Sequence, residues 1–117
     1  MDKFELDILG CGSATPTTFH KPSSQVLNIR EKLFMIDCGE GTQLQFRRSK
    51  SRFGRLNQIF ISHLHGDHCF GLIGLISTLA LLGRTGDLVI HSTSGLEEIL
   101  RHELDFFCKD NPFEVKI

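Results

Sequence analysis

The sequence has no tryptophan and no tyrosine, so phenylalanine is its only aromatic residue type. It also lacks an apolar stretch of about 20 residues, the length that a membrane-spanning helix requires, because Ser77 and Thr78 interrupt its longest apolar segment. The residues after Met1 do not have the pattern of a secretory signal peptide. From these absences we expect a cytoplasmic protein with no membrane partner.

Cysteine pairs of the C-x-x-C type are also absent. The chain has four cysteines, and they are widely separated: Cys11, Cys38, Cys69 and Cys108. Such spacing offers no paired thiolates for a structural zinc site and argues against a disulfide-linked scaffold. We expect these residues to be reduced thiols, mostly buried.

The chain has no strong excess of charge of either sign. Its 117 residues include 13 lysines and arginines and 14 aspartates and glutamates, which leaves a formal net charge of −1. A chain of this length forms one domain, and its near-neutral charge restricts any nucleic-acid-binding surface to a local patch.

One such patch is present, and no acid occurs between Glu40 and Asp67 to compensate it. Its five cations are Arg47, Arg48, Lys50, Arg52 and Arg55. Two interpretations stay open. Cations stabilise a helix C-terminus by about 0.3–1 kcal/mol each, or the run contacts the phosphates of a nucleic acid. On the second interpretation the possible substrate contacts are Arg47, Arg48 and Lys50.

Alternating apolar and polar residues predict strands in the first third of the chain. They are expected at Phe4–Leu9, Gln25–Arg30 and Leu33–Ile36, with a tight turn at Glu31–Lys32, so that the three form a hairpin or a meander. The intervening loop starts with two glycines and resembles a dinucleotide-binding fingerprint. Pro16 stands near the place of its third glycine and no helical pattern follows, so this interpretation is weak.

The rest of the chain alternates helical and strand patterns. A short helix is expected from Thr42 to about Ser49, and Cys69–Leu82 is apolar on nearly all sides, which predicts a helix covered by other structure. Ser94 and Glu97 match a capping box. The helix that follows should bury one stripe, formed by Leu96, Ile99, Leu100, Leu104 and Phe107. Further strands are expected at Ile59–Ile61, Leu88–Ile90 and Phe113–Ile117.

The most informative segment directly follows the strand at Ile59–Ile61. It reads Ser62-His63-Leu64-His65-Gly66-Asp67-His68. On an extended backbone His63 and His65 project to one face and can bind one ion. Asp67 and His68 are adjacent, so we expect their side chains to diverge. A histidine pair and a carboxylate–histidine pair predict two metal ions, an arrangement typical of enzymes that hydrolyse phosphate esters.

Two other interpretations of this segment stay open. It could be a chance cluster of surface histidines beside an aspartate that caps a helix. Cys69, which follows His68, could also contact a metal ion, although imidazole and oxygen ligands dominate the segment.

Asp37 is a further candidate residue, because it ends a strand of the buried type and precedes a glycine-rich segment. It could cap the following turn. It could also orient a metal-bound histidine from outside the coordination sphere, and the two roles are compatible.

Together these motifs resemble the metallo-β-lactamase superfamily, whose signature is similar to His63-Leu64-His65-Gly66-Asp67-His68. Their surroundings resemble one of its families, ribonuclease Z, the endonucleases that process the 3′ end of tRNA. The similar segments are Leu9–Pro16, Asp37–Gln43, Ile61–His68 and Phe70–Leu72. The resemblance covers the whole chain but only the first part of a family member.

The resemblance implies an α/β fold in which residues 1–117 form the N-terminal half of a four-layer αββα sandwich, a mixed sheet with flanking helices. His63 and His65 would bind a first zinc ion, and Asp67 and His68 a second. Asp67 would also transfer protons, and Asp37 matches a position outside the coordination sphere. The implied reaction removes the 3′ trailer from precursor tRNA by attack of a metal-activated water. An exposed inner sheet face would also favour a homo-oligomer, such as a homodimer.

Several departures from the family pattern bear on these expectations. The loop Thr17–Pro22, which contains His20, lacks a lysine–arginine–asparagine pattern usual there, and Ile73 stands where a proline is common. The family's other metal ligands and its tRNA-binding arm would lie beyond residue 117. His91 and His102 are not substitutes, since one ends a strand and the other lies on a helix. We therefore expect the chain alone to bind metal weakly or not at all and to be inactive.

Two alternative functions stay open. One is another phosphodiesterase of the superfamily that acts on small cyclic nucleotides, although the basic run favours the tRNA enzyme. The other is a non-catalytic domain that binds zinc for its structure. Closed structural sites use about four protein ligands, often cysteines, and this chain has no thiolate pair.

Overall fold

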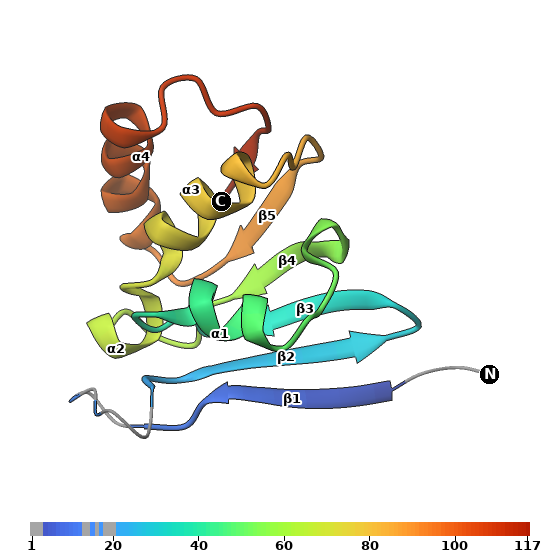
Figure 1. The fold of residues 1–117 in the computed structure, drawn as a ribbon. Coiled ribbons are helices and arrows are strands. Elements are labelled where there is room, and N and C mark those ends of the chain that lie inside the picture. The colour runs from blue at the N-terminus through green and yellow to red at the C-terminus, as the bar shows by residue number, and fades with distance from the viewer. Residues whose placement is uncertain (1–3, 13–14, 16, 18–20) are drawn as a thin grey trace.

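The computed structural model of the chain describes residues 4–12, 15, 17 and 21–117. Six strands form one mixed sheet in the order β1-β2-β3-β4-β5-β6, which is also their order in the sequence. The helices lie on one face of this sheet (Figure 1). The expected α/β architecture, a mixed sheet with flanking helices, is confirmed.

The first three strands form an antiparallel meander, as the sequence predicts. β1 spans Phe4–Gly10, β2 spans Ser24–Ile29 and β3 spans Lys32–Ile36. Arg30 and Glu31 form the turn between β2 and β3, one residue earlier than expected, with φ angles of 53° and 67°. Two consecutive residues with positive φ are typical of a type I′ hairpin turn, which matches the twist of the flanking strands.

The other three strands run parallel to β3. They are β4 (Leu56–Phe60), β5 (Leu88–His91) and β6 (Val115–Lys116). The connections contain α1 (Thr42–Arg48) and the 3₁₀ turn η1 (Phe53–Arg55), then α2 (Gly66–Cys69) and α3 (Leu72–Leu81), and finally α4 (Leu96–Phe107). Right-handed crossovers between strands in sequential order place all these helices on the same face of the sheet.

The core lies between the sheet and its helices. In β3, Leu33 and Met35 are buried on the helical side, whereas Phe34 and Ile36 alternate to the other side. Each layer contributes buried side chains. They include Val26, Leu56, Ile59, Leu88 and Ile90 from the strands, and Phe46, Leu72, Leu75, Ile76, Leu79, Leu100 and Leu104 from the helices. The described residues alone therefore form a continuous core.

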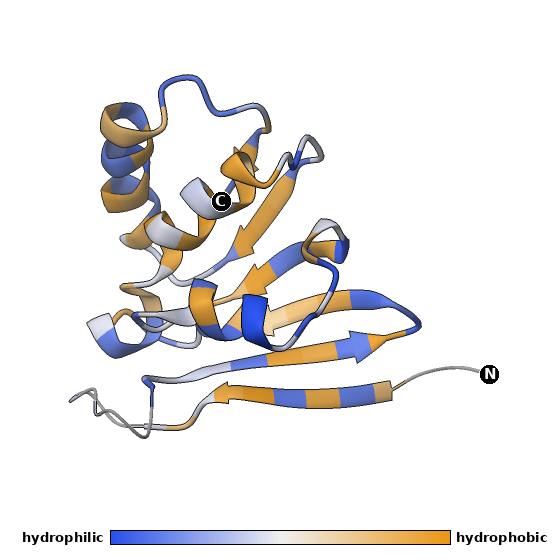
Figure 2. Cartoon of the chain, viewed as in Figure 1, coloured by the Kyte–Doolittle hydropathy of each residue, from blue (hydrophilic) through white to orange (hydrophobic). Residues whose placement is uncertain are grey.

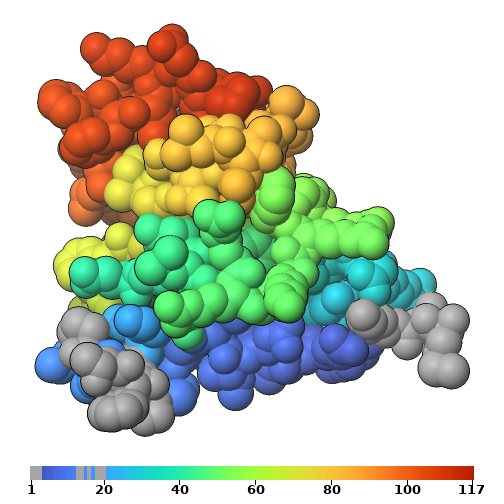
Figure 3. Space-filling view, in the orientation of Figure 1, coloured from blue at the N-terminus to red at the C-terminus, as the bar shows by residue number. Residues whose placement is uncertain are grey.

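The opposite face of the sheet is apolar, and no described helix covers it. We call it the open sheet face; its residues are Phe4, Leu6, Ile8, Leu27, Ile29, Phe34, Ile36 and Phe60. In β1 these side chains alternate with Glu5 and Asp7, as the stripes along that strand show (Figure 2). On the helical side, the helices and their connections hide most of the central strands, and β1 stays visible along one edge (Figure 3).

Two expectations about apolar helix faces are wrong. Cys69–Leu82 is not one helix covered on all sides, because α2 and α3 are separate and Phe70 and Leu81 are 69% and 85% exposed. In the α4 stripe, Ile99 and Phe107 are also exposed. Leu81, Ile99 and Phe107 lie on exposed helix faces, and Phe70 directly follows α2.

The ends of several elements also differ from the predictions. α4 has no capping box, because its N-cap residue is Gly95 at a φ of 106° and no side chain caps it. β4 begins at Leu56, earlier than expected, and β6 is shorter than the predicted strand at Phe113–Ile117. No helix in the described part of the chain combines the length and the apolar character needed to cross a membrane.

A buried arginine connects the end of α3 to the sheet. Arg84 lies in the turn between α3 and β5 and is 4% exposed. Its guanidinium donates hydrogen bonds of 2.6–2.9 Å to oxygens of Gly86, Leu56, Asn57 and Asp87. It also lies over the ring of Phe113, 5.4 Å from the centroid. This side chain therefore joins the starts of β4 and β5 to the segment that precedes β6.

Candidate metal centre

The predicted metal-binding segment lies at the carboxyl ends of two neighbouring parallel strands. Asp37 directly follows β3, and Ser62–His68 follows β4 after one intervening residue. Both segments therefore emerge at the same edge of the sheet, the usual place for a site in an open α/β fold. The Asp37 amide donates to the Phe60 carbonyl at 2.7 Å. The φ of Asp37 is 63°, in the left-handed region that aspartate tolerates better than most residues.

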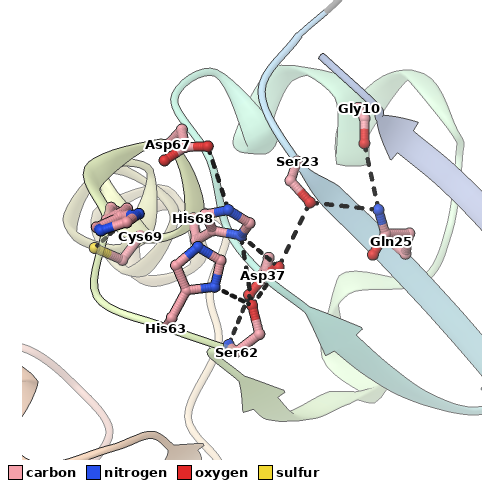
Figure 4. A network of polar contacts seen from close by, with 10 residues as sticks. Gly10, Ser23, Gln25, Asp37, Ser62, His63, Asp67, His68 and Cys69 are labelled. Carbon is pink, nitrogen blue, oxygen red and sulfur yellow. Dashed lines mark hydrogen bonds and ion pairs between the residues drawn. The ribbon is translucent and has the colours of Figure 1, made fainter. Parts of the chain in front are cut away.

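The Asp37 carboxylate is the centre of a hydrogen-bond network (Figure 4). Its Oδ1 accepts from the Ser62 backbone amide at 2.8 Å, and both its oxygens lie 2.9 Å from Ser62 Oγ. Its Oδ2 also lies 2.7 Å from Nδ1 of His68 and 3.5 Å from Oγ of Ser23. These contacts fix the orientation of the carboxylate and connect it to the metal-binding segment.

The same contacts determine the charge of Asp37. Burial by itself raises the pKa of this carboxyl group. The hydrogen bonds from the Ser62 amide, from His68 and from the Ser62 hydroxyl, together with the charge of His68, outweigh burial and lower the pKa below its ordinary value. At neutral pH Asp37 is therefore a carboxylate, which accepts hydrogen bonds and donates none.

Three imidazoles gather beside this network. The ring centroid of His63 lies 3.7 Å from that of His68 and 4.9 Å from that of His65. Nε2 of His68 lies 3.2 Å from Oδ2 of Asp67. The side chains of Asp67 and His68 therefore do not diverge, contrary to expectation, because Asp37 holds Nδ1 of His68 and so directs Nε2 toward Asp67.

These donor atoms suit zinc in type, since imidazole nitrogens and carboxylate oxygens are common zinc ligands. Within the described residues, however, no three or more His, Cys, Asp and Glu side chains are arranged so that they could hold one metal ion. The ring of His63 contacts the rings of both His65 and His68. The assignment of His63, His65, Asp67 and His68 as metal ligands stays a prediction.

The loop after β3 packs closely against the metal-binding segment. The Cys38 amide donates to the His68 carbonyl at 2.8 Å, and the Cys38 carbonyl accepts from the Gly71 amide at 2.9 Å. A Cβ on Gly39 would lie 2.7 Å from the carbonyl oxygen of Asp67, and a Cβ on Gly71 would overlap the carbonyl oxygen of Gly39. Only glycine permits this approach of the two backbones.

The cysteines are not arranged as metal ligands. All four belong to the described residues and none is in a disulfide, as predicted, but only Cys38 is fully buried. Burial raises the pKa of its thiol to about 12. Cys69 donates to the His65 carbonyl at 3.7 Å, and burial, followed by the charges of Glu103 and Asp67, raises its pKa. Thiols that resist ionisation are poor zinc ligands, because the thiolate is the form that binds.

The other histidines that the structure describes stay apart from this cluster. His91 stacks on Phe60 with ring centroids 4.5 Å apart, and its Nε2 lies 2.9 Å from Oε1 of Gln58. His102 is exposed on α4. His20 and the two residues before it lie outside the described residues.

The basic run lies at the opposite end of the sheet from the metal-binding segment. It precedes β4, whereas the metal-binding segment follows β4. Arg47 and Arg48 are exposed in the last turn of α1. The other three cations, Lys50, Arg52 and Arg55, line a polar hollow together with Glu5, Asp7 and Glu31. The acids that are missing from the neighbouring sequence therefore come from β1 and the β2–β3 turn, which the sequence pattern did not indicate.

Sequence reasoning did not identify Ser23 and Ser62 as parts of the network. The available signal was the position of Ser62, between the end of a strand and the first histidine of the motif. A hydroxyl at this position can reach the neighbouring imidazole. Which carboxylate it meets depends on the pairing of β3 with β4, which no local pattern specifies.

Comparison with known proteins gives a matching family model and several similar proteins. A family model described as Anti-Pycsar protein Apyc1 matches residues 4–110. A protein named ribonuclease Z from Bacteroides thetaiotaomicron is 70% identical over 115 residues, which cover 98% of this chain and 36% of the relative. A ribonuclease Z from Porphyromonas gingivalis is 62% identical over 117 residues, covering 100% of this chain and 38% of the relative. The chain thus spans less than two-fifths of the length of these relatives.

Solved structures agree with the fold. Human tRNase Z, short form, is 35% identical and superposes with a TM-score of 0.86, covering 98% of this chain and 44% of that chain. The metallo-β-lactamase fold protein YhfI from Bacillus subtilis superposes with a TM-score of 0.71 at 17% identity, covering 94% of this chain and 43% of that chain. The second likeness concerns the fold alone, and both confirm the arrangement of sheet and helices.

Proposed function

The chain belongs to the family described as Anti-Pycsar protein Apyc1, and we propose that it forms part of a tRNA 3′-processing endonuclease. It has a metallo-β-lactamase fold and matches the N-terminal part of ribonuclease Z. In this proposal residues 1–117 are the N-terminal part of a metallo-β-lactamase domain. The observation that carries it is the 70% identity to a ribonuclease Z over almost the whole chain.

The residues of the metal-binding segment take distinct roles in this proposal. His63 and His65 would bind one zinc ion, and Asp67 and His68 would bind a second. Zinc, when bound, polarises a phosphoryl oxygen and lowers the pKa of a water molecule toward 7. Asp37 accepts from Nδ1 of His68 and so leaves Nε2 available as a ligand.

The chain's own residues would also handle the substrate. Asp67 would transfer protons as water adds to the phosphorus of the scissile phosphodiester and the bond to the 3′ oxygen breaks, which leaves a 3′-hydroxyl on the tRNA and a phosphate on the trailer. Arg47, Arg48 and Lys50 contact substrate phosphates at a distance from the reacting bond. The relatives are longer than this chain, and in this proposal the remaining metal ligands correspond to residues of the relatives outside the matched segment. A cytoplasmic location and self-association through the open sheet face complete the proposal.

A chimera tests this function. The chain replaces the matching segment of the Bacteroides thetaiotaomicron ribonuclease Z, to which it is 70% identical. We expect the chimera to cleave precursor tRNA, and the 117-residue chain alone to be inactive. In the chimera, H63A together with H65A should lower cleavage more than about 100-fold, because even residues outside the coordination sphere affect metal sites by 10–100-fold.

Elemental analysis of zinc separates the parts of this proposal. The double variant should bind less zinc than the chimera with both histidines, and unchanged zinc content would refute the ligand assignment. A folded, zinc-loaded chimera that leaves precursor tRNA intact would refute the nuclease assignment. The alternative that the sequence leaves open, hydrolysis of small cyclic nucleotides by another phosphodiesterase of the superfamily, is tested in the same chimera. Cleavage of a cyclic nucleotide but not of precursor tRNA by the chimera would support it.

A further inference from the structure

Ser62 lies between the Asp37 carboxylate and the first histidine of the metal-binding segment. Its Oγ is 2.9 Å from both carboxylate oxygens of Asp37 and 3.1 Å from Nδ1 of His63 (Figure 4). The same Oγ is 3.5 Å from Nδ1 of His68, a longer contact. The hydroxyl is therefore placed to connect Asp37 with a histidine that Asp37 does not itself contact in this network.

The hydrogen atoms of this network can be assigned from chemistry. A serine hydroxyl has one hydrogen to donate and two lone pairs that accept. The Asp37 carboxylate accepts only, so the Ser62 hydrogen must point toward it; otherwise two oxygens would lie 2.9 Å apart with no hydrogen between them. Oγ then presents a lone pair to Nδ1 of His63, and this nitrogen must carry the hydrogen.

We propose that Ser62 is a positioning residue that holds His63 in the Nδ1–H tautomer, which leaves the lone pair of Nε2 available for a metal ion. Asp37 acts on His68 in the same way but directly, through the 2.7 Å contact with Nδ1. One carboxylate thus sets the tautomers of two histidines, one directly and one through a hydroxyl. The role of this tautomer in metal binding rests on the proposed function, whereas the contacts of Ser62 do not depend on it.

The position of Ser62 makes the inference testable without loss of the fold. Its side chain is exposed, so truncation to alanine opens no cavity. Its backbone amide keeps the 2.8 Å hydrogen bond to Asp37 in any variant except proline. Ser62→Ala therefore removes only the hydroxyl link, and Ser62→Thr retains a hydroxyl.

The direct test is nitrogen-15 NMR of the histidine rings in the metal-free chain at pH 8, where an ordinary histidine is neutral. In the unmodified chain we expect His63 as the Nδ1–H tautomer. In Ser62→Ala we expect a shift to the Nε2–H tautomer, which neutral imidazoles of histidine favour in water, and in Ser62→Thr a return to Nδ1–H. Ser92→Ala is the matched control, because Ser92 Oγ donates to the Thr93 carbonyl.

Zinc affinity, measured by competition with a chromophoric chelator, is the second readout. Ser62→Ala should weaken binding by about 10-fold or more, the effect usual for partners of ligating histidines, whereas Ser62→Thr and Ser92→Ala should stay near the unmodified value. The inference is overturned if His63 is the Nε2–H tautomer in the unmodified chain, or if Ser62→Ala leaves the tautomer unchanged. Because the described residues of the 117-residue chain lack a complete set of ligands, zinc affinity is measured in the chimera. A chimera that binds no zinc would refute the metal assignment, and the NMR spectra would still decide the role of Ser62.

Discussion

Two charged side chains are buried among the described residues, and they organise opposite ends of the sheet. Asp37 gathers the metal-binding segment at the carboxyl ends of β3 and β4. Arg84 gathers the starts of β4 and β5 through four hydrogen bonds. In both cases hydrogen bonds satisfy the buried charged group, which lowers the cost of burying it.

The arrangement around Arg84 predicts a large effect of a conservative substitution. Arg84→Lys should lower the free energy of unfolding by about 2–4 kcal/mol, because an ammonium group cannot reach all four oxygens and each buried carbonyl left unpaired costs about 1–3 kcal/mol. Urea denaturation measures the change. Arg47→Lys, at an exposed position, is the control and should change the value by less than about 0.5 kcal/mol. Equal effects of the two substitutions would contradict the connecting role of Arg84.

Single residues were predictable from the sequence where their partners are close in the chain. His63, His65, Asp67 and His68 stand out because they lie together in one short segment. The partners of Arg84 on β4 lie 27 and 28 positions earlier, and Ser62 lies 25 positions after Asp37. Such pairs meet only when the parallel strands have paired, so residue types and spacing do not show them.

At the scale of elements, two glycines allow the loop after β3 to contact the start of α3. Gly71→Ala would place a methyl group against the carbonyl oxygen of Gly39, and backbone atoms cannot move aside as a flexible side chain can. We expect this substitution to lower the free energy of unfolding by about 1–3 kcal/mol, the usual cost of overpacking. It should also weaken zinc binding, because the contact positions His68 through Cys38.

Gly54→Ala is the matched control for this prediction. Gly54 lies in η1, and a Cβ there would meet open space. Its replacement should leave stability within about 1 kcal/mol and zinc affinity unchanged. If Gly71→Ala behaved in the same way as Gly54→Ala, the close packing of the two loops would not matter for the site.

The cations at and after the end of α1 lead to a prediction about tRNA binding. In the active chimera, neutralising Arg47, Arg48 and Lys50 to glutamine should weaken tRNA binding and reduce its dependence on salt. Each lost phosphate contact lowers the slope of log affinity against log salt by about 0.9 for duplex-like nucleic acid. Arg55→Gln should change the slope less, because acids of β1 share its hollow. An unchanged slope in the triple variant would indicate that these cations stabilise the end of α1 and do not contact tRNA.

Most elements, but not their exposed faces, were predictable from the sequence. Alternation predicts β2 and β3 because one side of each strand is buried against helices, whereas the apolar side of β1 is exposed on the open sheet face. Hydropathy cannot show which apolar side chains stay uncovered, as Phe70, Leu81 and Ile99 demonstrate. The capping-box prediction is wrong for a different reason: the N-cap residue of α4 is Gly95, with a positive φ, and not Ser94.

At the scale of the whole molecule, the strand order explains the open sheet face. Strands that follow one another in sequence with right-handed crossovers leave one side of a sheet without helices. That side has several neighbouring apolar side chains, among them Phe34 and Phe60, whose ring centroids are 6.5 Å apart. Contiguous exposed apolar patches above about 300–600 Å² are uncommon on monomers and usually mark a contact surface.

We therefore expect the 117-residue chain to self-associate through the open sheet face. Covering about 500 Å² at about 25 cal/mol per Å² contributes roughly 12 kcal/mol before the costs of association. Sedimentation velocity should show dimers or larger species, and Phe34→Glu with Phe60→Glu should return the chain to a monomer. Phe106→Glu with Phe107→Glu is the control, because these exposed rings lie on α4, away from that face. A stable monomer of the unmodified chain, or dissociation caused by the α4 pair, would contradict this prediction.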